Sequence, residues 1–472
     1  MWLARVAVKK EFLHLGNTDR RNLLDIAEQM LSQYPLCDQC LGRQFAWLST
    51  DTSNQERGRS IKLLLSMQAD EQIKSGDRVG GMKLLTELAG NGSFGPARTL
   101  IKKNGIDPPS ARDCHLCSLE GGSVFGRASE IAERVIETTK DIEFNTFLIG
   151  CVPVPALAER EEELRAHFSL LRGEPLKSDF NRELGKQVQR ALGKEANFER
   201  SDIVIVYDMI HDTLDLQINP IFIYGRYRKL VRGIPQSRWD CTACGGRGCE
   251  SCGGTGRRYP DSISEYVGIP IQTLSQGTGF KFHGAGREDI DALMLGSGRP
   301  FVVEVSRPRI RTLDFQELTR AINEGAQGKV EVAELQASQR ERAQFLKHES
   351  SRNVKEYSAI IKAANHLEEE ELRRAERELS GVEIEQRTPT RVSHRRKDLL
   401  RRKRVYEVKL SHREDGLLDG NFIVQGGTYV KELISGDDGR TRPSLSGIVN
   451  TECVCQELVV LSIRTAETDH NA

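Results

Sequence analysis

The chain has 472 residues, of which 38% are hydrophobic and 29% charged. At ~150 residues per domain, this length predicts two or three domains, and the composition excludes disorder over most of the chain. Because 68 Lys and Arg residues balance 68 Asp and Glu residues, the protein is no globally basic nucleic-acid coat protein, although a local basic patch is possible. We found no apolar run of the ~18–20 residues that a membrane helix needs and no signal peptide, so we expect a cytoplasmic protein without a membrane partner.

The first half of the chain mixes helices with a few strands. An amphipathic helix is predicted over residues 19–34, where apolar residues recur at helical spacing. Further helices are predicted within residues 51–90 and at residues 128–140 and 156–171, and strands at residues 145–152 and 203–207. This order indicates an α/β or α+β accessory domain over residues 1–210.

Strands outnumber helices in the second half, residues 211–472. Strands are predicted within residues 216–227 and at residues 301–305, 330–335, 357–364, 405–410, 421–425 and 457–463. Helices are predicted at residues 314–323 and 368–379, and the charged second helix is interpreted as a solvated face. The pattern predicts an α+β domain whose mixed, largely antiparallel sheet carries helices on one side.

Eight of the eleven cysteines form four Cys-x-x-Cys pairs. In a reducing compartment this spacing indicates metal ligation before disulfides. One set joins distant segments and suits a closed structural zinc site, with unligated core thiols as the alternative. That set is Cys37, Cys40, Cys114 and Cys117.

The other two Cys pairs are separated by only four residues. They are Cys241 and Cys244, then Cys249 and Cys252, with glycines that permit a tight turn. The sequence leaves open whether they bind a second zinc. The run also resembles the cysteine-glycine repeats of a chaperone zinc domain. The remaining Cys151, Cys453 and Cys455 are interpreted as core residues.

Three segments carry residues suited to chemistry. Residues 281–291 run from a strand into a glycine loop that can present a carboxylate and a guanidinium to a bulky substrate, or form a surface turn with a local ion pair. Residues 387–404 include nine Lys or Arg residues and no aromatic residue. This composition suits contacts with RNA phosphates, or alternatively a solvated basic helix or linker. In residues 426–433, Thr428 is predicted to cap a helix that brings Tyr429 and Lys431 together, or that is simply a capped helix.

In their common order, these segments resemble one family. It is the two-domain pseudouridine synthase of archaea and eukaryotes that acts on uridines 54 and 55 in the T-arm of tRNA. The matching residues are 221–227 with 234–236, 283–289, 355–359, 390–396, and 427–432 with 439–443. For the N-terminal half, the resemblance implies an RNA-binding THUMP-type domain that contains the zinc site of the first cysteine set.

The resemblance also implies roles for single residues. Asp289 is the catalytic aspartate, paired with Lys431, and the uridine lies among Tyr357, Tyr429 and Leu458. The RNA-binding residues are Arg287, Arg391, Arg395 and Arg396. In one departure from the family pattern, Ala292 and Leu293 follow Asp291 where an arginine is common, so a supporting contact from that arginine is in doubt.

The implied reaction fits the residues present. Converting uridine to pseudouridine is an isomerisation, so no small-molecule cofactor is expected, and the chain has no Walker motif or G-x-G-x-x-G cradle. A nearby lysine would favour the charged form of the attacking carboxylate. We expect a monomer with tRNA as partner. The alternative is a zinc-dependent RNA-binding or chaperone module without catalysis, whose function would not depend on Asp289.

Overall fold

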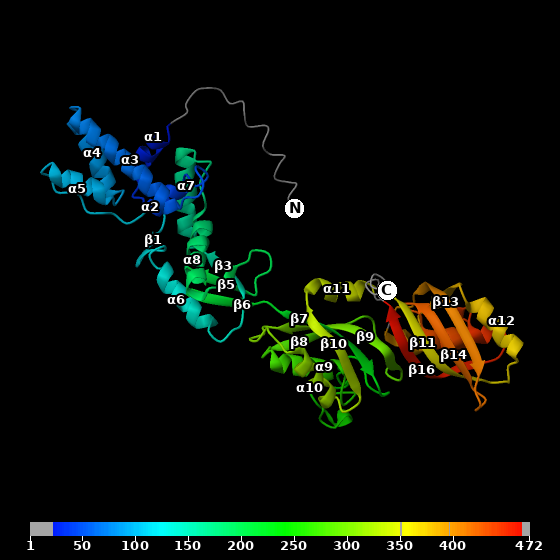
Figure 1. Cartoon of the computed structure of the whole chain (residues 1–472). Coiled ribbons are helices and arrows are strands. Elements are labelled where there is room, and N and C mark those ends of the chain that lie inside the picture. Colours follow the sequence, from blue (N-terminus) through cyan, green and yellow to red (C-terminus); the bar gives the residue numbers. More distant parts are fainter. Residues whose placement is uncertain (1–21, 350–351, 396, 465–472) are drawn as a thin grey trace, which may run out of the picture. The chain divides into compact units, whose positions relative to one another are not determined.

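The computed structural model describes residues 22–349, 352–395 and 397–464 (Figure 1). It divides into two compact units. The first comprises the chain up to Lys140 together with Asn145–Gln217, and the second comprises Asp141–Phe144 together with the chain from Ile218 onward.

The first unit begins with helices. α1 (Leu23–Gln33) starts where the side chain of Asn22 accepts a hydrogen bond from the backbone of Leu24. The predicted helical stretch at 51–90 is two helices, because the chain turns at Gly76 and restarts at the N-cap Asp77. The elements of this part are α2 (Asp38–Arg43), α3 (Asn54–Lys74), α4 (Arg78–Gly90), α5 (Gly95–Lys103), β1 (Ser118–Leu119) and β2 (Gly122–Ser123).

A four-stranded sheet completes the first unit, in the order β4-β3-β5-β6. β3 runs parallel to both β4 and β5. The elements are α6 (Ala128–Thr139), β3 (Thr146–Val152), α7 (Pro155–Phe168), α8 (Leu176–Leu192), β4 (Glu195–Ala196), β5 (Ile203–Asp208) and β6 (Thr213–Ile218). Because β6 extends this sheet, the domain boundary expected after residue 210 falls inside the unit.

The second unit is built on a ten-stranded sheet, and the predicted α+β class is confirmed. The strand order is β10-β7-β9-β16-β11-β14-β13-β12-β15, with β8 pairing to β9. Every pair is antiparallel except β9 with β16, so the sheet is largely antiparallel, as predicted. The strands are β7 (Ile221–Lys229), β8 (Gly279–Gly284), β9 (Leu293–Ser306), β10 (Val330–Ser338), β11 (Val354–Ala363), β12 (Glu383–Arg387), β13 (Leu400–His412), β14 (Leu418–Gln425), β15 (Thr441–Arg442) and β16 (Cys453–Arg464).

Helices pack around this sheet and complete its hydrophobic core. α9 contributes Ile263, Val267 and Ile271, and α10 contributes Leu318 and Ile322. The helical elements are α9 (Ile263–Leu274), α10 (Phe315–Gly325), α11 (Arg340–Glu349), α12 (Glu369–Leu379), α13 (Val430–Ser435), α14 (Leu445–Val449) and the short 3₁₀ turns η3 (Glu250–Cys252) and η4 (Thr390–Arg395).

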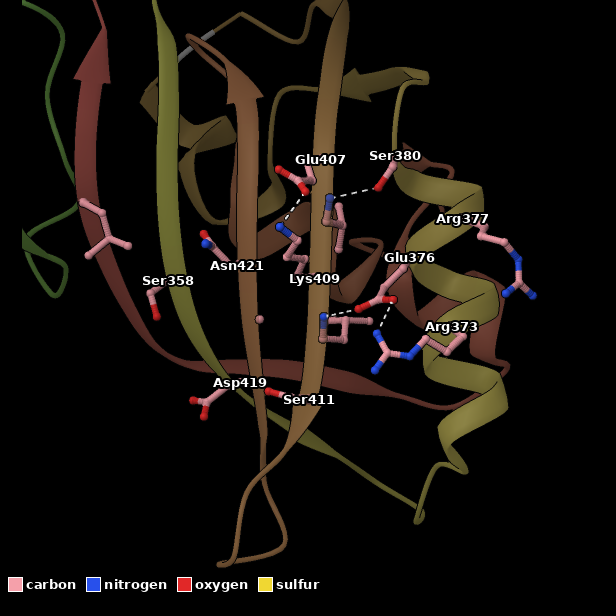
Figure 2. A pocket seen from close by; sticks show the side chains of 14 residues that line it. Ser358, Arg373, Glu376, Arg377, Ser380, Glu407, Lys409, Ser411, Asp419 and Asn421 are labelled. Atoms are coloured by element: carbon pink, nitrogen blue, oxygen red, sulfur yellow. Dashed lines mark hydrogen bonds and ion pairs between the residues drawn. The ribbon is translucent and has the colours of Figure 1, made fainter.

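α12 is amphipathic, so its interpretation as a solvated charged face was incomplete. Leu372, Ala375 and Leu379 are buried on one side of it. Figure 2 shows its polar side chains capping the outer edge of β13: Glu376 accepts a hydrogen bond from the backbone N–H of Leu410 at 2.6 Å. Such a contact keeps an exposed strand edge from pairing with another chain.

A cavity of about 690 Å³ opens between α12 and the strands β13 and β14 (Figure 2). Ser358 of β11 lines it. Because successive strand residues point to opposite faces of a sheet, this cavity lies on the face opposite to that of the neighbouring Tyr357.

Candidate functional site

The glycine loop predicted from the sequence connects β8 to β9. Gly286 adopts a positive φ of +77°, a conformation that glycine adopts without strain. Arg299 donates a hydrogen bond to the carbonyl of Ala285 at 2.8 Å, and Lys229 donates one to the carbonyl of Ile290 at 2.6 Å. Two basic side chains from neighbouring strands therefore hold the loop at both ends.

A buried ion pair lies directly beneath this loop. The guanidinium of Arg299 is 2.8 Å from the carboxylate of Glu288, and the two side chains are 1% and 2% exposed. The hydroxyl of Tyr227 donates to Glu288 at 2.9 Å, and the Gln236 amide donates to Tyr227 at 2.8 Å. Burial opposes charge on Arg299, but the Glu288 carboxylate outweighs it and raises the pKa of the guanidinium. The pairing of Glu288 with Arg299 and Tyr227 was not predicted from the sequence, because it depends on how the strands are arranged in the sheet.

Next to this pair, a cavity of about 540 Å³ gathers most of the residues implied by the family resemblance. The segments that line it include the β8–β9 loop, β11, η4, β13, the start of α13, and β16. The predicted residues that line it are Arg287, Asp289, Tyr357, Arg391, Tyr429, Lys431 and Leu458. Of the remaining predicted RNA-binding residues, Arg396 and the side chain of Arg395 lie outside the described residues.

The ion pairs in this cavity differ from the expected one. Lys431 lies 2.5 Å from Asp291, so the predicted pairing of Lys431 with Asp289 is wrong. Instead, Arg391 approaches Asp289 at 2.9 Å and Glu432 at 2.6 Å, which places one guanidinium between two carboxylates. Burial would raise the pKa of Asp291, but the hydrogen bond and charge of Lys431 outweigh burial and lower it.

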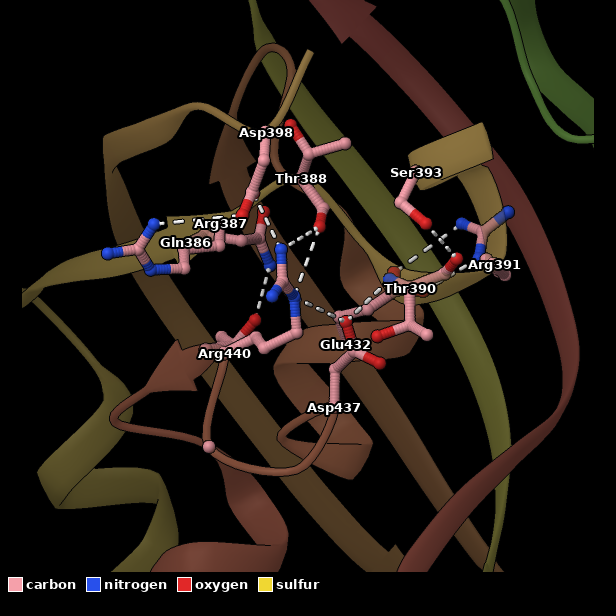
Figure 3. Close-up of polar contacts among 12 residues, drawn as sticks. Gln386, Arg387, Thr388, Thr390, Arg391, Ser393, Asp398, Glu432, Asp437 and Arg440 are labelled. Carbon is pink, nitrogen blue, oxygen red and sulfur yellow. Dashed lines mark hydrogen bonds and ion pairs between the residues drawn. The ribbon is translucent and has the colours of Figure 1, made fainter. Parts of the chain in front are cut away.

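Arg391 projects from η4, and Figure 3 shows how this turn is anchored. The backbone N–H of Thr390 donates to Asp437 at 2.9 Å. Arg440 donates to the carbonyl of Thr388 at 2.9 Å and to Asp398 at 2.6 Å. The start of the basic segment is therefore fixed by its own ion pairs, and Arg391 contacts protein carboxylates within the cavity.

The start of α13 also differs from expectation. Tyr429, and not Thr428, occupies the N-cap position. The Thr428 hydroxyl donates to the carbonyl of Gln425 at 2.7 Å, while the backbone N–H of Tyr429 donates to the side chain of Gln386 at 2.8 Å. The predicted capping by Thr428 is wrong, although Tyr429 and Lys431 do lie together at the cavity.

Lys355 also lines the cavity, although it was not among the site residues predicted from the sequence. It lies two residues before Tyr357 on β11, so both side chains share one face, and they are 4% and 9% exposed. Burial, reinforced by the nearby charge of Arg299, lowers the pKa of Lys355 to about 7. Burial likewise raises the pKa of Tyr357 to about 12. The period of two along the strand could have identified Lys355 from the sequence.

Lys355→Met is expected to stabilise the protein most at low pH. In the unfolded chain lysine keeps its proton up to about pH 10.4, whereas folded Lys355 loses it near pH 7. Between these values the unfolded state binds more protons, so the native protein gains stability as pH rises. The gain from methionine should therefore be largest below pH 7 and shrink toward pH 10. Urea denaturation at pH 6.5 and 9.5 measures it, with the exposed Lys362→Met on the same strand as control. An equal effect at both pH values would contradict the expectation.

Both sets of paired cysteines form clusters in which all four sulfurs lie within 4.8 Å of one another. In the first set, Cys37 Sγ is 3.7 Å from Cys117 Sγ. A tetrahedral zinc site with Zn–S bonds of ~2.3 Å has sulfurs about 3.8 Å apart. The donor atoms of this cluster therefore fit a closed metal site, and the same holds for the second set, Cys241, Cys244, Cys249 and Cys252.

The other cysteines do not join these clusters. Cys151 and Cys453 are buried, in accord with their interpretation as core residues, and Cys455 is half-buried. Within the described part of the chain, no helix combines the length and the apolar character needed to cross a membrane.

Comparisons with known proteins place this chain in a family. The family model described as Pus10, C-terminal, matches residues 222–464, and the model of the archaeal Pus10 THUMP domain matches residues 131–208. A protein of Methanothrix thermoacetophila named tRNA pseudouridine synthase Pus10 is 43% identical over 442 residues, covering 94% of each chain. The protein of the same name from Methanocaldococcus jannaschii is 40% identical over 454 residues, covering 94% of this chain and 95% of its own.

Among solved structures, a Cbf5–Nop10–Gar1 complex shows a weak likeness. It is 17% identical, covers 43% of this chain and 45% of that chain, and has a TM-score of 0.28. The chain belongs to the Pus10 family of tRNA pseudouridine synthases.

Proposed function

We propose that this protein converts uridines 54 and 55 in the T-arm of tRNA to pseudouridine, with Asp289 as the catalytic residue. The observation that carries the proposal is the cavity in which the Asp289 carboxylate lies with Tyr357 and Leu458. It combines a reactive carboxylate with an aromatic ring and an apolar side chain, which together suit one base removed from its stack.

The reaction rearranges bonds within one nucleotide. The bond from C1′ to N1 of the base breaks, the base turns, and a bond forms from C1′ to C5. C5 loses a proton and N1 gains one, so the atoms balance without a redox cofactor. The carboxylate of Asp289 can attack the nucleotide covalently or accept a proton.

We assign each surrounding residue a role in holding the uridine or in positioning Asp289. Tyr357 stacks on the uracil, Leu458 packs beneath it, and Tyr429 lines the same space. Arg391 is a positioning residue, because its guanidinium lies 2.9 Å from Asp289 and sets the direction of the carboxylate. Lys431 acts on the loop through Asp291 and not through Asp289.

Contacts to the RNA backbone are assigned to exposed cations around the cavity. Arg287 is exposed at its rim. Arg395 and Arg396 continue the basic segment that starts at Arg391, and such cations bind phosphates without reading the base sequence.

We also propose that the protein acts as a monomer in the cytoplasm, where its tRNA substrate is located. Since full-length relatives are named as synthases, a non-catalytic zinc or chaperone module is not favoured.

Nucleoside analysis tests the proposed reaction. An unmodified tRNA transcript incubated with the purified protein, with no cofactor added, should gain one pseudouridine for each uridine lost and release no free uracil. A transcript whose uridine content stays constant under these conditions would refute the isomerase assignment.

We further propose that Cys37, Cys40, Cys114 and Cys117 hold a structural zinc ion in the THUMP-containing unit. Zinc would join the start of α2 to the segment before β1, and metal binding of this kind is coupled to folding. Cys37→Ser with Cys40→Ser should therefore lower both the zinc content and the melting temperature of this unit. Cys151→Ser, outside the cluster, should leave zinc content unchanged. Elemental analysis that finds equal zinc in the double variant and the parent would exclude this site.

A further inference from the structure

The second cysteine cluster lies in a segment built from two consecutive copies of one pattern. Residues 241–248 and 249–256 both read Cys-x-x-Cys-Gly-Gly-x-Gly, and together we call them the Cys-Gly knuckle. The Sγ atoms of Cys241 and Cys249 are 3.9 Å apart, and those of Cys249 and Cys252 are 3.7 Å apart. Both distances match the ~3.8 Å edge of a tetrahedral zinc–thiolate site.

The two copies close on each other through glycines. A Cβ atom at Gly248 would lie 2.6 Å from the carbonyl oxygen of Gly254, and one at Gly256 would clash with the carbonyl of Gly246. Both Gly248 and Gly256 also have positive φ, at +94° and +67°. Each copy thus contributes the glycine that lets the other approach, and this close approach gathers the four sulfurs.

Backbone N–H groups point at the sulfurs of the knuckle. Gly248 donates to Cys244 Sγ and Gly256 donates to Cys252 Sγ, each at 3.2 Å. Cysteine binds a metal as the thiolate, and N–H groups that point at a sulfur complement the negative charge of a metal-bound thiolate. The repeat therefore supplies four close sulfurs and the donors that stabilise their charge.

The surface of the knuckle is basic and partly aromatic. Arg247 and Arg258 are exposed, and neither forms an ion pair with a carboxylate in the part of the chain that the structure describes. The guanidinium of Arg258 lies 5.5 Å from the ring centre of Trp239 and 5.9 Å from that of Tyr259. Cations without a carboxylate partner, next to aromatic rings, suit an RNA backbone.

The knuckle is attached at the edge of the active-site cavity. Its ends join where Cys241 donates a backbone hydrogen bond to Gly256 at 2.8 Å. At the base of the segment, the Gln236 carbonyl accepts a hydrogen bond from the backbone of Ser264 at 2.8 Å. The Gln236 side chain reaches the catalytic loop and donates to the Gly286 carbonyl at 2.9 Å. RNA that enters the cavity would therefore pass close to the base of the knuckle.

We propose that Cys241, Cys244, Cys249 and Cys252 bind a second zinc ion, and that the metal-closed knuckle uses Arg247 and Arg258 to contact the phosphate backbone of tRNA. The RNA partner rests on the proposed function, whereas the metal site rests on the cluster alone. The knuckle thereby forms a second RNA contact, separate from the THUMP-containing unit.

Metal analysis of the full-length protein tests the first half. Protein purified without chelator should contain two zinc ions per chain. Cys249→Ser with Cys252→Ser should contain one, and so should Cys37→Ser with Cys40→Ser. The metal site would be overturned if the Cys249/Cys252 variant contained two zinc ions. It would also be overturned if the parent contained only one zinc ion and this variant retained it.

Binding of an unmodified tRNA transcript, measured from 50 to 200 mM salt, tests the second half with variants that keep all cysteines. Arg247→Gln and Arg258→Gln should each retain both zinc ions, weaken binding several-fold and lower the salt slope by roughly 0.7–0.9. The exposed Arg377→Gln on α12 is the matched control and should leave the slope unchanged. Slopes of both knuckle variants equal to that of the parent would overturn the RNA contact and leave the knuckle available to a protein partner.

The affinity for tRNA and the zinc content of the protein test this proposal independently of pseudouridine formation. If the parent binds tRNA and the knuckle variants weaken that binding, the RNA contact stands even where no pseudouridine is formed. If pseudouridine forms normally and the salt slope does not change, the proposed function stands and the knuckle contact is wrong.

Discussion

Asp289→Asn is expected to lower the rate of pseudouridine formation about a thousandfold or more. The amide has nearly the same shape as the carboxylate, but it can neither attack the nucleotide nor accept a proton as a carboxylate does. Arg391 retains its second partner, Glu432 at 2.6 Å, so the variant should keep its structure. Affinity for tRNA should stay within a few-fold of the parent, because backbone contacts are spread over other residues. Initial rates and binding curves on the same transcript measure both quantities.

Asp291→Asn is the matched control for that experiment. It removes a carboxylate two residues away, whose partner is Lys431 at 2.5 Å and not the reacting base. We expect a much smaller loss of rate, because only the support of the loop changes. An inactive Asp291 variant beside a fully active Asp289 variant would reverse the assignment of the catalytic residue.

Glu288→Gln is expected to produce the largest loss of stability in the second unit, about 3–5 kcal/mol. The substitution leaves the Arg299 guanidinium, 1% exposed, without its charged partner in a site closed to water. The hydroxyl of Tyr227 loses its carboxylate acceptor at the same time. Urea denaturation followed by a probe in the second unit measures the change in the free energy of unfolding.

An exposed ion pair provides the comparison. Glu407→Gln breaks the contact between Glu407 and Lys409 at 2.7 Å, where both side chains are largely in water. Exposed pairs contribute little, so we expect this variant to unfold almost as the parent does. Similar denaturation curves for the Glu288 and Glu407 variants would show that the buried Glu288–Arg299 pair contributes no more to the free energy of unfolding than an exposed pair does.

The sequence was informative where a pattern is local. Apolar runs identified most strands of the second unit, and cysteine spacing identified two clusters whose sulfurs the structure brings together. Short motifs in a fixed order indicated the family, and most of the residues they implicate line one cavity. Such signals depend on neighbours along the chain, which a single sequence records directly.

Contacts between distant segments could not be predicted in the same way. Arg391 reaches Asp289 because η4 is anchored near α13, and no local pattern encodes that approach. For the same reason, the predicted partner of Lys431 was Asp289, whereas the structure pairs it with Asp291. Glu288 pairs with Arg299 only because β8 and β9 are adjacent, and this register becomes known only from the fold.

Several helices were not predicted from the sequence, and α8 and α9 are two of them. Phe180, Leu184 and Val188 recur at helical spacing in α8 and are all buried. α9 contains Pro270, which argues against a helix, yet its apolar residues pack into the core of the second unit. In α9, tertiary packing outweighs the local preference of the chain.

The central claim, that this cavity isomerises T-arm uridines of tRNA, is tested most directly by mapping every pseudouridine in an unmodified transcript after incubation with the full-length protein. We predict new pseudouridine at positions 54 and 55, and none there when Asp289→Asn replaces the parent. Pseudouridine only at other positions, or the same map with the Asp289 variant, would contradict the claim.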